Sequence, residues 1–413
     1  MNNNSSNKNS KNSGDENNKN NKKNTNKEKT SKSDKLVWRI CIVLCTMMIT
    51  ALTIYLSNKD MPIYKQDDAE SSIEKAKIVK VINENVESDK KSENIKKGSM
   101  DIELKILTGR YKGETHKITH HISVLYNVVV DEGDVVSVRI DERNDGDHEV
   151  SIYNYYRVND IIGCLVIFAL VLIIVGGFKG FKALIGLIFT IVSIIWILLP
   201  LTLKGYSPVA VTLCVVLVAT VVSLVLIDGW TRKTRVAIVG TMGGILVGML
   251  FALVATKVMN VTTYQMEEAE SLLLVNQSVG LKVKNLFLCS ILISCMGAVM
   301  DVAMSIASAI EELKMVDKNI TSKKLFTSSM NIGKDAMGTM TNTLILAFAG
   351  NSLNMMILLY SYGISFGQLM NTDFVAIEII SAIAGSIGII AAVPLVSFVG
   401  AYIKENGNLA NKK

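Results

Sequence analysis

Long apolar runs separated by short polar segments dominate the chain after residue 157. Each run is long enough to cross a hydrocarbon core of about 30 Å as an α-helix. The seven runs cover residues 160–177, 181–203, 208–227, 236–255, 286–310, 338–360 and 375–402. An eighth run, 36–56, is longer than the apolar core of a signal peptide and is typical of an uncleaved membrane anchor. The pattern predicts an α-helical polytopic membrane protein with about eight spans, seven of them in one domain over residues 158–403.

The segment 57–157 is polar, and parts of it alternate between apolar and polar residues, as β-strands do. Ile102, Leu104 and Ile106, for example, alternate with charged neighbours. Further alternating or turn-forming segments are 136–140, 150–152, 108–109, 112–113 and 131–134. We predict one small β-barrel-like domain here, with strands from about residue 75.

The basic residues lie beside the apolar runs and form no patch suited to nucleic acid. With the N-terminus in the cytoplasm, the inside loops and C-terminal tail hold 13 Lys and Arg, against 4 in the short outside loops. This asymmetry is the one that the positive-inside rule describes. The sequence therefore predicts both termini inside, an extracytoplasmic β-domain, the lipid bilayer as a partner and no nucleic-acid partner.

The two ends of the chain are predicted to be cytoplasmic tails. Residues 1–35 contain 12 Asn and 9 Lys and almost no apolar residue. Such a segment cannot bury enough surface to offset the entropy of ordering, so we expect a disordered basic tail. Residues 404–413 form a second, short tail.

Polar and small residues recur on one face of the apolar run 286–310. Their separations of 4, 3, 4, 4, 3 and 4 residues place them on a single helical stripe. A carboxylate that faces lipid is costly, so the stripe is expected to face other helices or a water-filled path. Asp301 is then a candidate proton or cation site, or else a structural group bonded to neighbouring hydroxyls or amides. The stripe consists of Ser290, Ser294, Gly297, Asp301, Ser305, Ser308 and Glu312.

The next apolar run, 338–360, is the expected partner of this stripe. Asp335, Thr339 and Asn342 share a face of this antiparallel helix, and Asn342 enters to a depth close to that of Asp301. Amide and hydroxyl side chains can satisfy a carboxyl group across a helix interface. The segment 311–337 between the two runs is expected to form a cytoplasmic amphipathic helix.

Glycines at four-residue spacing predict close helix packing, because they let two backbones approach. Gly240, Gly244 and Gly248 follow this spacing in the run 236–255, and Gly297 has the same expected role. Glu378 lies one turn inside the run 375–402, where a hydrated carboxylate at the membrane surface is expected.

The four histidines all lie in the predicted β-domain. His116 and His120 would share one face of a strand, and two imidazoles could bind a metal. The spacing ties no acidic or cysteine ligand to them, so His116, His120, His121 and His148 are expected to be solvated. No metal site is predicted.

The sequence argues against an enzyme and against a cofactor. It contains no GxxxxGK[ST] motif for an ATP-driven motor. No apolar run contains the histidine of a Ser–His protease. Only Asp301 is a deep carboxylate, whereas an aspartyl dyad needs two.

Several of these segments resemble the YibE/F-like family of multi-spanning bacterial membrane proteins. The resemblance covers about residues 75–402 and rests mainly on 297-GAVMDVAMSIASAIEEL-313 and 333-GKDAMGTMTNTLILAFAG-350. Relatives often have Arg and Tyr where this chain has Lys334 and Phe348, which keep the charge and the ring. The resemblance implies a multi-pass protein of the bacterial cytoplasmic membrane and names no substrate.

Two hypotheses about function follow. The first is a permease for a small solute or ion, coupled to protons or cations, with a polar path between the runs 286–310 and 338–360. The second is a non-transport envelope scaffold, sensor or accessory subunit, whose β-domain binds an envelope protein partner.

Overall fold

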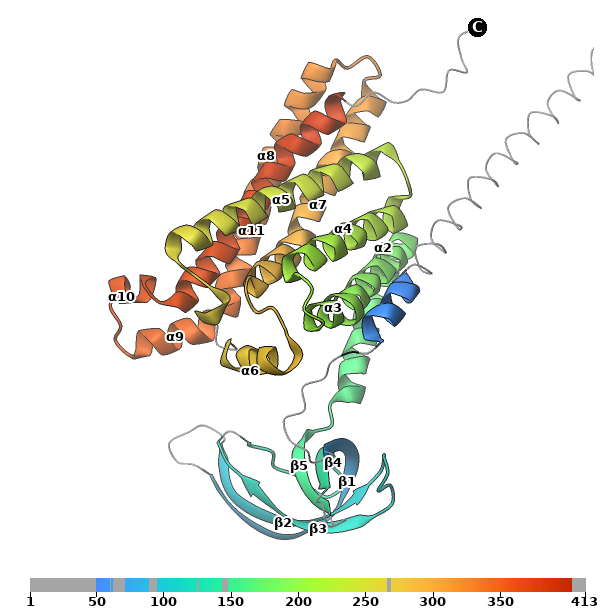
Figure 1. The fold of residues 1–413 in the computed structure, drawn as a ribbon. Helices are drawn as coiled ribbons and strands as arrows, with labels where there is room; N and C mark the ends of the chain where they lie inside the picture. Colours follow the sequence, from blue (N-terminus) through green and yellow to red (C-terminus); the bar gives the residue numbers. More distant parts are fainter. Residues whose placement is uncertain are drawn as a thin grey trace, which may run out of the picture. The chain divides into compact units, whose positions relative to one another are not determined.

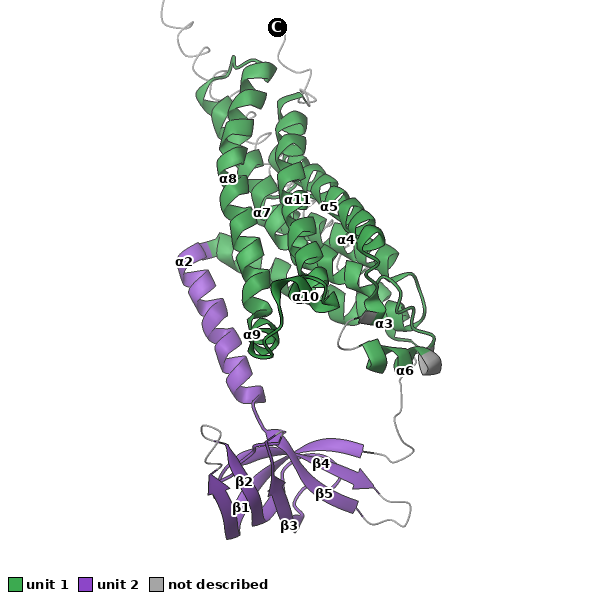
Figure 2. Ribbon diagram, turned by 90° about the vertical axis from the view of Figure 1, so that its left-hand side faces the viewer, with its two compact units in different colours: residues 1–63, 178–413 green, residues 64–177 purple. Residues whose placement is uncertain are grey.

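The computed structural model describes residues 50–59, 61, 71–88, 95–124, 126–142, 148–265 and 269–402. The predicted tails and most of the anchor lie outside these residues, although residues 50–58, at the end of the anchor, are helical. The chain divides into a helical unit, residues 1–63 and 178–413, and a β unit, residues 64–177 (Figure 2).

The β unit contains a five-stranded antiparallel sheet in the order β3-β2-β1-β4-β5 (Figure 1). The long strand β1 pairs with β4 through its first residues and with β2 through the rest. Register shifts in β1 allow it to bend, and the sheet curls so that its edge strands, β3 and β5, contact each other. A separate curled β-domain was predicted, and it is confirmed. The strands are β1 Ser71–Ser88, β2 Lys96–Ile106, β3 Thr115–Ile122, β4 Val135–Glu142 and β5 His148–Tyr155.

The alternating residues of the sequence fill the inside of this curled sheet. Ile102, Leu104 and Ile106 are fully buried, and their charged neighbours are more exposed. Val136, Val138 and the neighbouring strands complete the core. Burying each such side chain contributes about 1.5–3 kcal/mol, so the period of two in the sequence decides which face of the sheet lies inside.

The rest of the described chain is helical. Five continuous helical stretches are long and apolar enough to cross a membrane, and a bent pair, α8 and α9, makes a sixth. These helices are compatible with a membrane protein. The α-helices that follow the sheet, short ones included, are α2 Val158–Ser193, α3 Leu199–Leu203, α4 Pro208–Asp228, α5 Arg232–Met259, α6 Ala269–Val279, α7 Leu286–Val316, α8 Ser322–Asn351, α9 Leu353–Ser361, α10 Phe366–Met370 and α11 Asp373–Tyr402.

The first stretch, Val158–Leu203, contains two of the predicted runs in 46 residues. At 1.5 Å per residue this length is about 69 Å, more than twice the thickness of a hydrocarbon core. Gly177 interrupts it with a non-helical conformation (φ 55°, ψ −139°), and the boundary between the two units falls there. Glycine adopts this conformation without steric cost.

Two expectations about the following helices are corrected. Residues 311–337 do not form a separate amphipathic helix, because α7 continues to Val316 and α8 already begins at Ser322. The Thr321 hydroxyl caps α8 by accepting a hydrogen bond from the backbone N–H of Lys324 (3.3 Å). The run 338–360 is not one straight helix either, since α8 and α9 meet at a 55° bend beside Ser352.

Within the helical unit, α11 packs against α5, α7 and α8 (Figure 1). Glycines make the α5–α11 contact close: a Cβ added at Gly244 would lie 2.6 Å from the carbonyl oxygen of Gly388. A Cβ at Gly248 would lie 2.7 Å from the Ala384 carbonyl oxygen, and one at Gly240 would overlap a valine side chain of α11. Gly297 differs, because an added Cβ there would meet no atom within 4 Å.

Basic residues tie three helices together at one end of the helical unit. Arg232, at the start of α5, donates a 2.7 Å hydrogen bond to the carbonyl oxygen of Gly400 near the end of α11. Lys314, in the last turn of α7, donates to the same oxygen at 3.4 Å. The start of α5 and the ends of α7 and α11 therefore lie together, and cations there complement the negative ends of the α7 and α11 dipoles.

Candidate functional site

The polar stripe of α7 forms one continuous face of that helix. The opposite face is apolar and buried, with Val299 and Ile306 fully inside the core. The stripe therefore points away from the helices that pack against α7. Ser290, Ser294, Asp301, Ser305 and Glu312 are exposed, and Gly297 and Ser308 are half-buried.

Asp301 lies at the midpoint of α7, which runs from Leu286 to Val316. At 1.5 Å per residue, its Cα is about 22 Å from each end of the helix. Among the described residues it has no hydrogen bond or ion pair. The hydroxyls of Ser294 and Ser308 donate to carbonyl oxygens of their own helix, at 3.1 and 2.7 Å. The structure therefore gives the carboxyl group no protein partner within the part of the chain that it describes.

The predicted partner residues on α8 also lie on an exposed surface. Asp335, Thr339 and Asn342 are all exposed. The Thr339 hydroxyl donates to the Ala336 carbonyl oxygen (3.0 Å), and Asn342 has no side-chain hydrogen bond to another described residue. The expected hydrogen bond between Asp301 and Asn342 is thus not formed in this structure.

The register of the α7–α8 hairpin explains the offset between these two residues. Ile306 of α7 lies against Gly333 of α8, where an added Cβ would be 3.1 Å from the isoleucine Cδ1. Because the helices are antiparallel, Asp301 falls opposite residue 338. Asn342 is one helical turn further along α8, an offset of about 6 Å along the axis. Both polar faces are exposed, on the sides opposite the residues through which α7 and α8 pack, and no hydrogen bond joins them among the described residues.

The bend between α8 and α9 adds a second carboxyl group. Glu378 of α11 lies beside Ser352, at the bend. It is half-buried, and its Oε2 is buried with no hydrogen-bond partner among the described residues. The expectation of a hydrated surface carboxylate is corrected: the bend and the start of α11 shield this oxygen from solvent.

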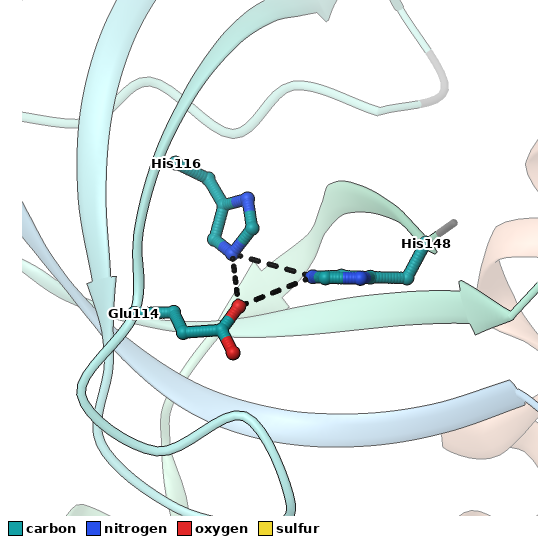
Figure 3. A group of neighbouring side chains, drawn as sticks. All are labelled: Glu114, His116 and His148. Atoms are coloured by element: carbon teal, nitrogen blue, oxygen red, sulfur yellow. Dashed lines mark hydrogen bonds and ion pairs between the residues drawn. The ribbon is translucent and has the colours of Figure 1, made fainter. Parts of the chain in front are cut away.

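A different group of side chains converges in the β unit (Figure 3). Glu114 directly precedes β3, His116 is the second residue of β3, and His148 begins β5. Glu114 Oε2 lies 3.2 Å from His116 Nε2 and 3.4 Å from His148 Nε2. The two Nε2 atoms are themselves 3.4 Å apart. Three groups that can each bind a metal therefore point at one spot between the edge strands.

An aromatic side chain orients one of the two imidazoles. The ring of Tyr111 stacks on His148 with centroids 4.1 Å apart. The tyrosine hydroxyl donates a 2.7 Å hydrogen bond to Glu142 Oε1, and this bond to a carboxylate raises the pKa of Tyr111. Glu142 pairs with His148 across β4 and β5, so Tyr111 is held at both ends.

Sequence reasoning paired His116 with His120 and missed the other two members of this cluster, Glu114 and His148. His116 and His120 share a face of β3, as expected, but the cluster does not include His120. His120 is buried, with Nε2 2.8 Å from the carbonyl oxygen of Val128, and burial lowers its pKa.

The expectation that no acidic group accompanies the histidines is corrected by Glu114. Its two-residue spacing from His116 was a usable signal, since residues i and i+2 of an extended segment share a face. No sequence signal linked either of them to His148, which is brought close only by the curl of the sheet.

The two units define a class of protein in which several long apolar helices are joined to a small curled sheet. The YibE/F-like protein family matches residues 164–406, and the YibE/F family N-terminal domain matches residues 70–155. The chain therefore belongs to the YibE/F-like family, as its motifs predicted. No curated protein and no solved structure matches it.

Proposed function

We propose that the protein is a multi-pass permease of the bacterial cytoplasmic membrane. It moves a small solute or ion, coupled to protons or cations, along a path lined by the polar faces of α7 and α8. Asp301 is the protonatable or cation-binding group, and Thr339 and Asn342 coordinate the cargo or relay it. The proposal includes no enzymatic step.

The helices support an eight-span topology. In this topology the anchor predicted from the sequence at 36–56, most of which lies outside the described residues, is one span. The two parts of Val158–Leu203 on either side of Gly177 are two more. Four more are α4, α5, α7 and α11, and the bent pair α8–α9 is the last. The basic cluster around Arg232 and Lys314 favours placing that end of the helical unit in the cytoplasm.

The observation that carries the proposal is the carboxyl group of Asp301, which has no partner among the described residues and lies at the midpoint of an apolar helix. An aspartate at the centre of a membrane helix costs about 3 kcal/mol when lipid surrounds it. A water-filled path along the stripe removes most of this cost, and the exposed polar face of α8 supplies further polar groups.

The bent pair α8–α9 supports the same proposal. Transporters often bind their substrates at interrupted helices, where backbone groups are not used within the helix. Here the interruption lies beside Glu378, whose Oε2 has no hydrogen-bond partner in the described structure. This carboxylate is placed to attract cations toward the path.

The test is ion flux into vesicles reconstituted with the full chain. The vesicles contain a pH-sensitive dye and are exposed to proton, Na⁺ and K⁺ gradients in turn. We expect flux above that of protein-free vesicles, and Asp301→Asn should lower it at least about tenfold, because that one variant removes the central charge.

The matched control is Glu312→Gln. It removes a carboxylate from the same stripe near the end of α7, and it should change the flux less than about twofold. Equal flux in the wild type and Asp301→Asn would refute the assignment of the site.

A second function, that of a sensor or scaffold acting through the β unit, is favoured by the cluster of Glu114, His116 and His148. A strain that lacks the protein would be tested under metal, acid and osmotic stress. Rescue by Asp301→Asn but not by a chain without residues 71–155 would favour this second function over transport.

A further inference from the structure

The ligand atoms of Glu114, His116 and His148 already have the separations that a bound metal requires. Their three separations are 3.2, 3.4 and 3.4 Å. In a tetrahedral zinc site with bonds of about 2.0–2.1 Å, adjacent ligand atoms lie about 3.3–3.4 Å apart. We propose that these residues bind a divalent first-row transition metal of the zinc type. This proposal does not depend on transport by the helical unit.

The donor set selects the class of metal. Two imidazole nitrogens and one carboxylate suit zinc and its neighbours, whereas Ca²⁺ and Mg²⁺ prefer oxygen ligands only. Three protein ligands leave one tetrahedral position for water or for a ligand from solution. A metal bound with such an open position can exchange, which suits capture or sensing better than a permanent structural role.

Solvent can reach the site. The side chains of His116, His148 and Glu114 are 23%, 17% and 49% exposed. The imidazoles are thus largely shielded, and the carboxylate lies at the opening. A hydrated metal can therefore approach from the Glu114 side, where the two imidazole nitrogens displace water molecules from it.

The surrounding structure holds the ligands in place before a metal arrives. Both histidines lie on paired strands, with His116 opposite Leu104 and His148 opposite Glu142. The stacked ring of Tyr111 further restricts His148. Groups in the outer shell that fix the orientation of a ligand typically raise metal affinity 10- to 100-fold. We therefore expect little rearrangement on binding.

A metal at this position would connect the two edges of the sheet. Glu114 and His116 belong to the β3 edge, and His148 belongs to the β5 edge. A bond from each edge to one ion would close the partly open barrel. Because the unfolded chain does not hold these ligands together, binding should stabilise the folded β unit.

Hydrogen bonds alone provide the competing explanation. Glu114 Oε2 could accept from the Nε2–H groups of both histidines at the observed distances. In that arrangement the cluster would join the strands without metal. The two explanations differ in metal affinity, and the experiment measures it directly.

The experiment uses the full chain in detergent, stripped of metal with a chelator that is then removed. Zn²⁺ is titrated in competition with a chromogenic chelator, and Co²⁺ absorption reports the coordination geometry. We expect one Zn²⁺ per chain, a tetrahedral Co²⁺ spectrum, and no competition from Ca²⁺ or Mg²⁺. Glu114→Gln, His116→Gln and His148→Gln should each weaken Zn²⁺ binding at least about tenfold.

The matched control is His121→Gln, an exposed histidine of β3 outside the cluster, which should bind as the wild type does. Absence of binding, or equal binding in all variants, would overturn the proposal and favour hydrogen bonds alone. Hydrogen exchange of β1 and β2 checks folding without metal. If a histidine variant loses this protection, the Zn²⁺ affinity of Glu114→Gln tests the proposal instead. That substitution should not unfold the sheet, because the Glu114 side chain is half-exposed and lies before β3.

Asp301→Asn serves as the control that separates this proposal from the one on transport. It should keep full Zn²⁺ affinity even if it abolishes flux. Loss of flux with normal metal binding would leave the metal site intact, and loss of metal binding with normal flux would leave the permease intact.

Discussion

In the β unit, three polar side chains from separate parts of the chain meet within 3.4 Å of one another. In the helical unit, by contrast, the polar residues of α7 come from consecutive turns of one helix, and Asp301 meets no partner among the described residues. A strand edge supplies one or two groups, and the curl of the sheet brings the other edge to them. One helix supplies all the residues of a polar stripe, but a second surface or water must satisfy their hydrogen-bonding groups.

This contrast separates two kinds of evidence for a site. Converging ligand atoms allow a specific claim about what binds, because their separations can be compared with those of known coordination. A polar stripe indicates where a polar solute or ion could pass, and experiment must identify that solute or ion. If the two units are as separate as this contrast requires, a change in one should leave the other unaffected.

The largest effect is expected from Ile102→Ala in the centre of β2. This side chain is fully buried between residues of β1 and β3, so its loss should destabilise the β unit by about 3 kcal/mol. Hydrogen exchange in the full chain should show faster exchange in β1–β5 and no change in α5 or α11. Ile73→Ala, at a position that is 59% exposed, is the control. Faster exchange in both units would show that they unfold together.

Removal of zinc should have the next largest effect. At a free zinc concentration about 100 times the dissociation constant, binding adds about 2.7 kcal/mol to the stability of the β unit. Chelation should therefore speed hydrogen exchange in β3 and β5 of the wild type. His148→Gln should not respond to chelation, and an equal response in this variant would mean that the stabilising metal is bound elsewhere.

A smaller effect is expected from Gly244→Ala in the α5–α11 contact. The new methyl group would lie 2.6 Å from the Gly388 carbonyl oxygen, so the helices must separate, at a cost of about 2 kcal/mol. Equilibrium unfolding in mixed detergent micelles measures this loss in the free energy of unfolding. Gly297→Ala meets no atom within 4 Å and should leave stability unchanged or raise it by up to about 1 kcal/mol, since alanine favours helix. Equal destabilisation by both variants would show that the exposed stripe is also closely packed.

The smallest effect is expected from the pH dependence of the β unit through His120. Burial lowers the pKa of this histidine in the folded state, so below pH about 6.5 the unfolded chain binds more protons. The β unit should therefore lose stability as the pH falls from about 6.5 toward the folded-state pKa, measured by hydrogen exchange of β3. His120→Gln should show a flatter profile, and an unchanged profile would assign the acid sensitivity to other groups.

Much of the fold follows from local patterns. The period of two around Ile102 and Val138 predicts strands with a buried face, and both residues are fully buried. The apolar runs predict long helices because length and hydropathy are local properties. The helix ends were harder to predict: the segment 311–337 was expected to form a separate amphipathic helix, yet its residues continue α7 and α8 on either side of a short turn.

The candidate sites were predictable to different degrees. The α7 stripe could be read directly, because a helix keeps residues at three- and four-residue spacing on one face. Its surroundings could not, because the neighbours of Asp301 depend on how α7 packs against other helices. Spacing likewise placed Asn342 at a depth close to that of Asp301, but the antiparallel register sets the two residues about one helical turn apart.

The sequence by itself determined the class of protein, the positions of its long helices and strands, the polar face of α7 and membership of the YibE/F-like family. The first three depend on periodicity and composition, which act over a few residues, whereas family membership follows from the resemblance of motifs such as 297–313 and 333–350. The tertiary structure alone decided that Glu114 and His116 meet His148, more than thirty residues away, and that α8 bends beside Glu378. Both depend on long-range packing, because the curl of a sheet and the contacts around a bend are set by residues distant in the chain.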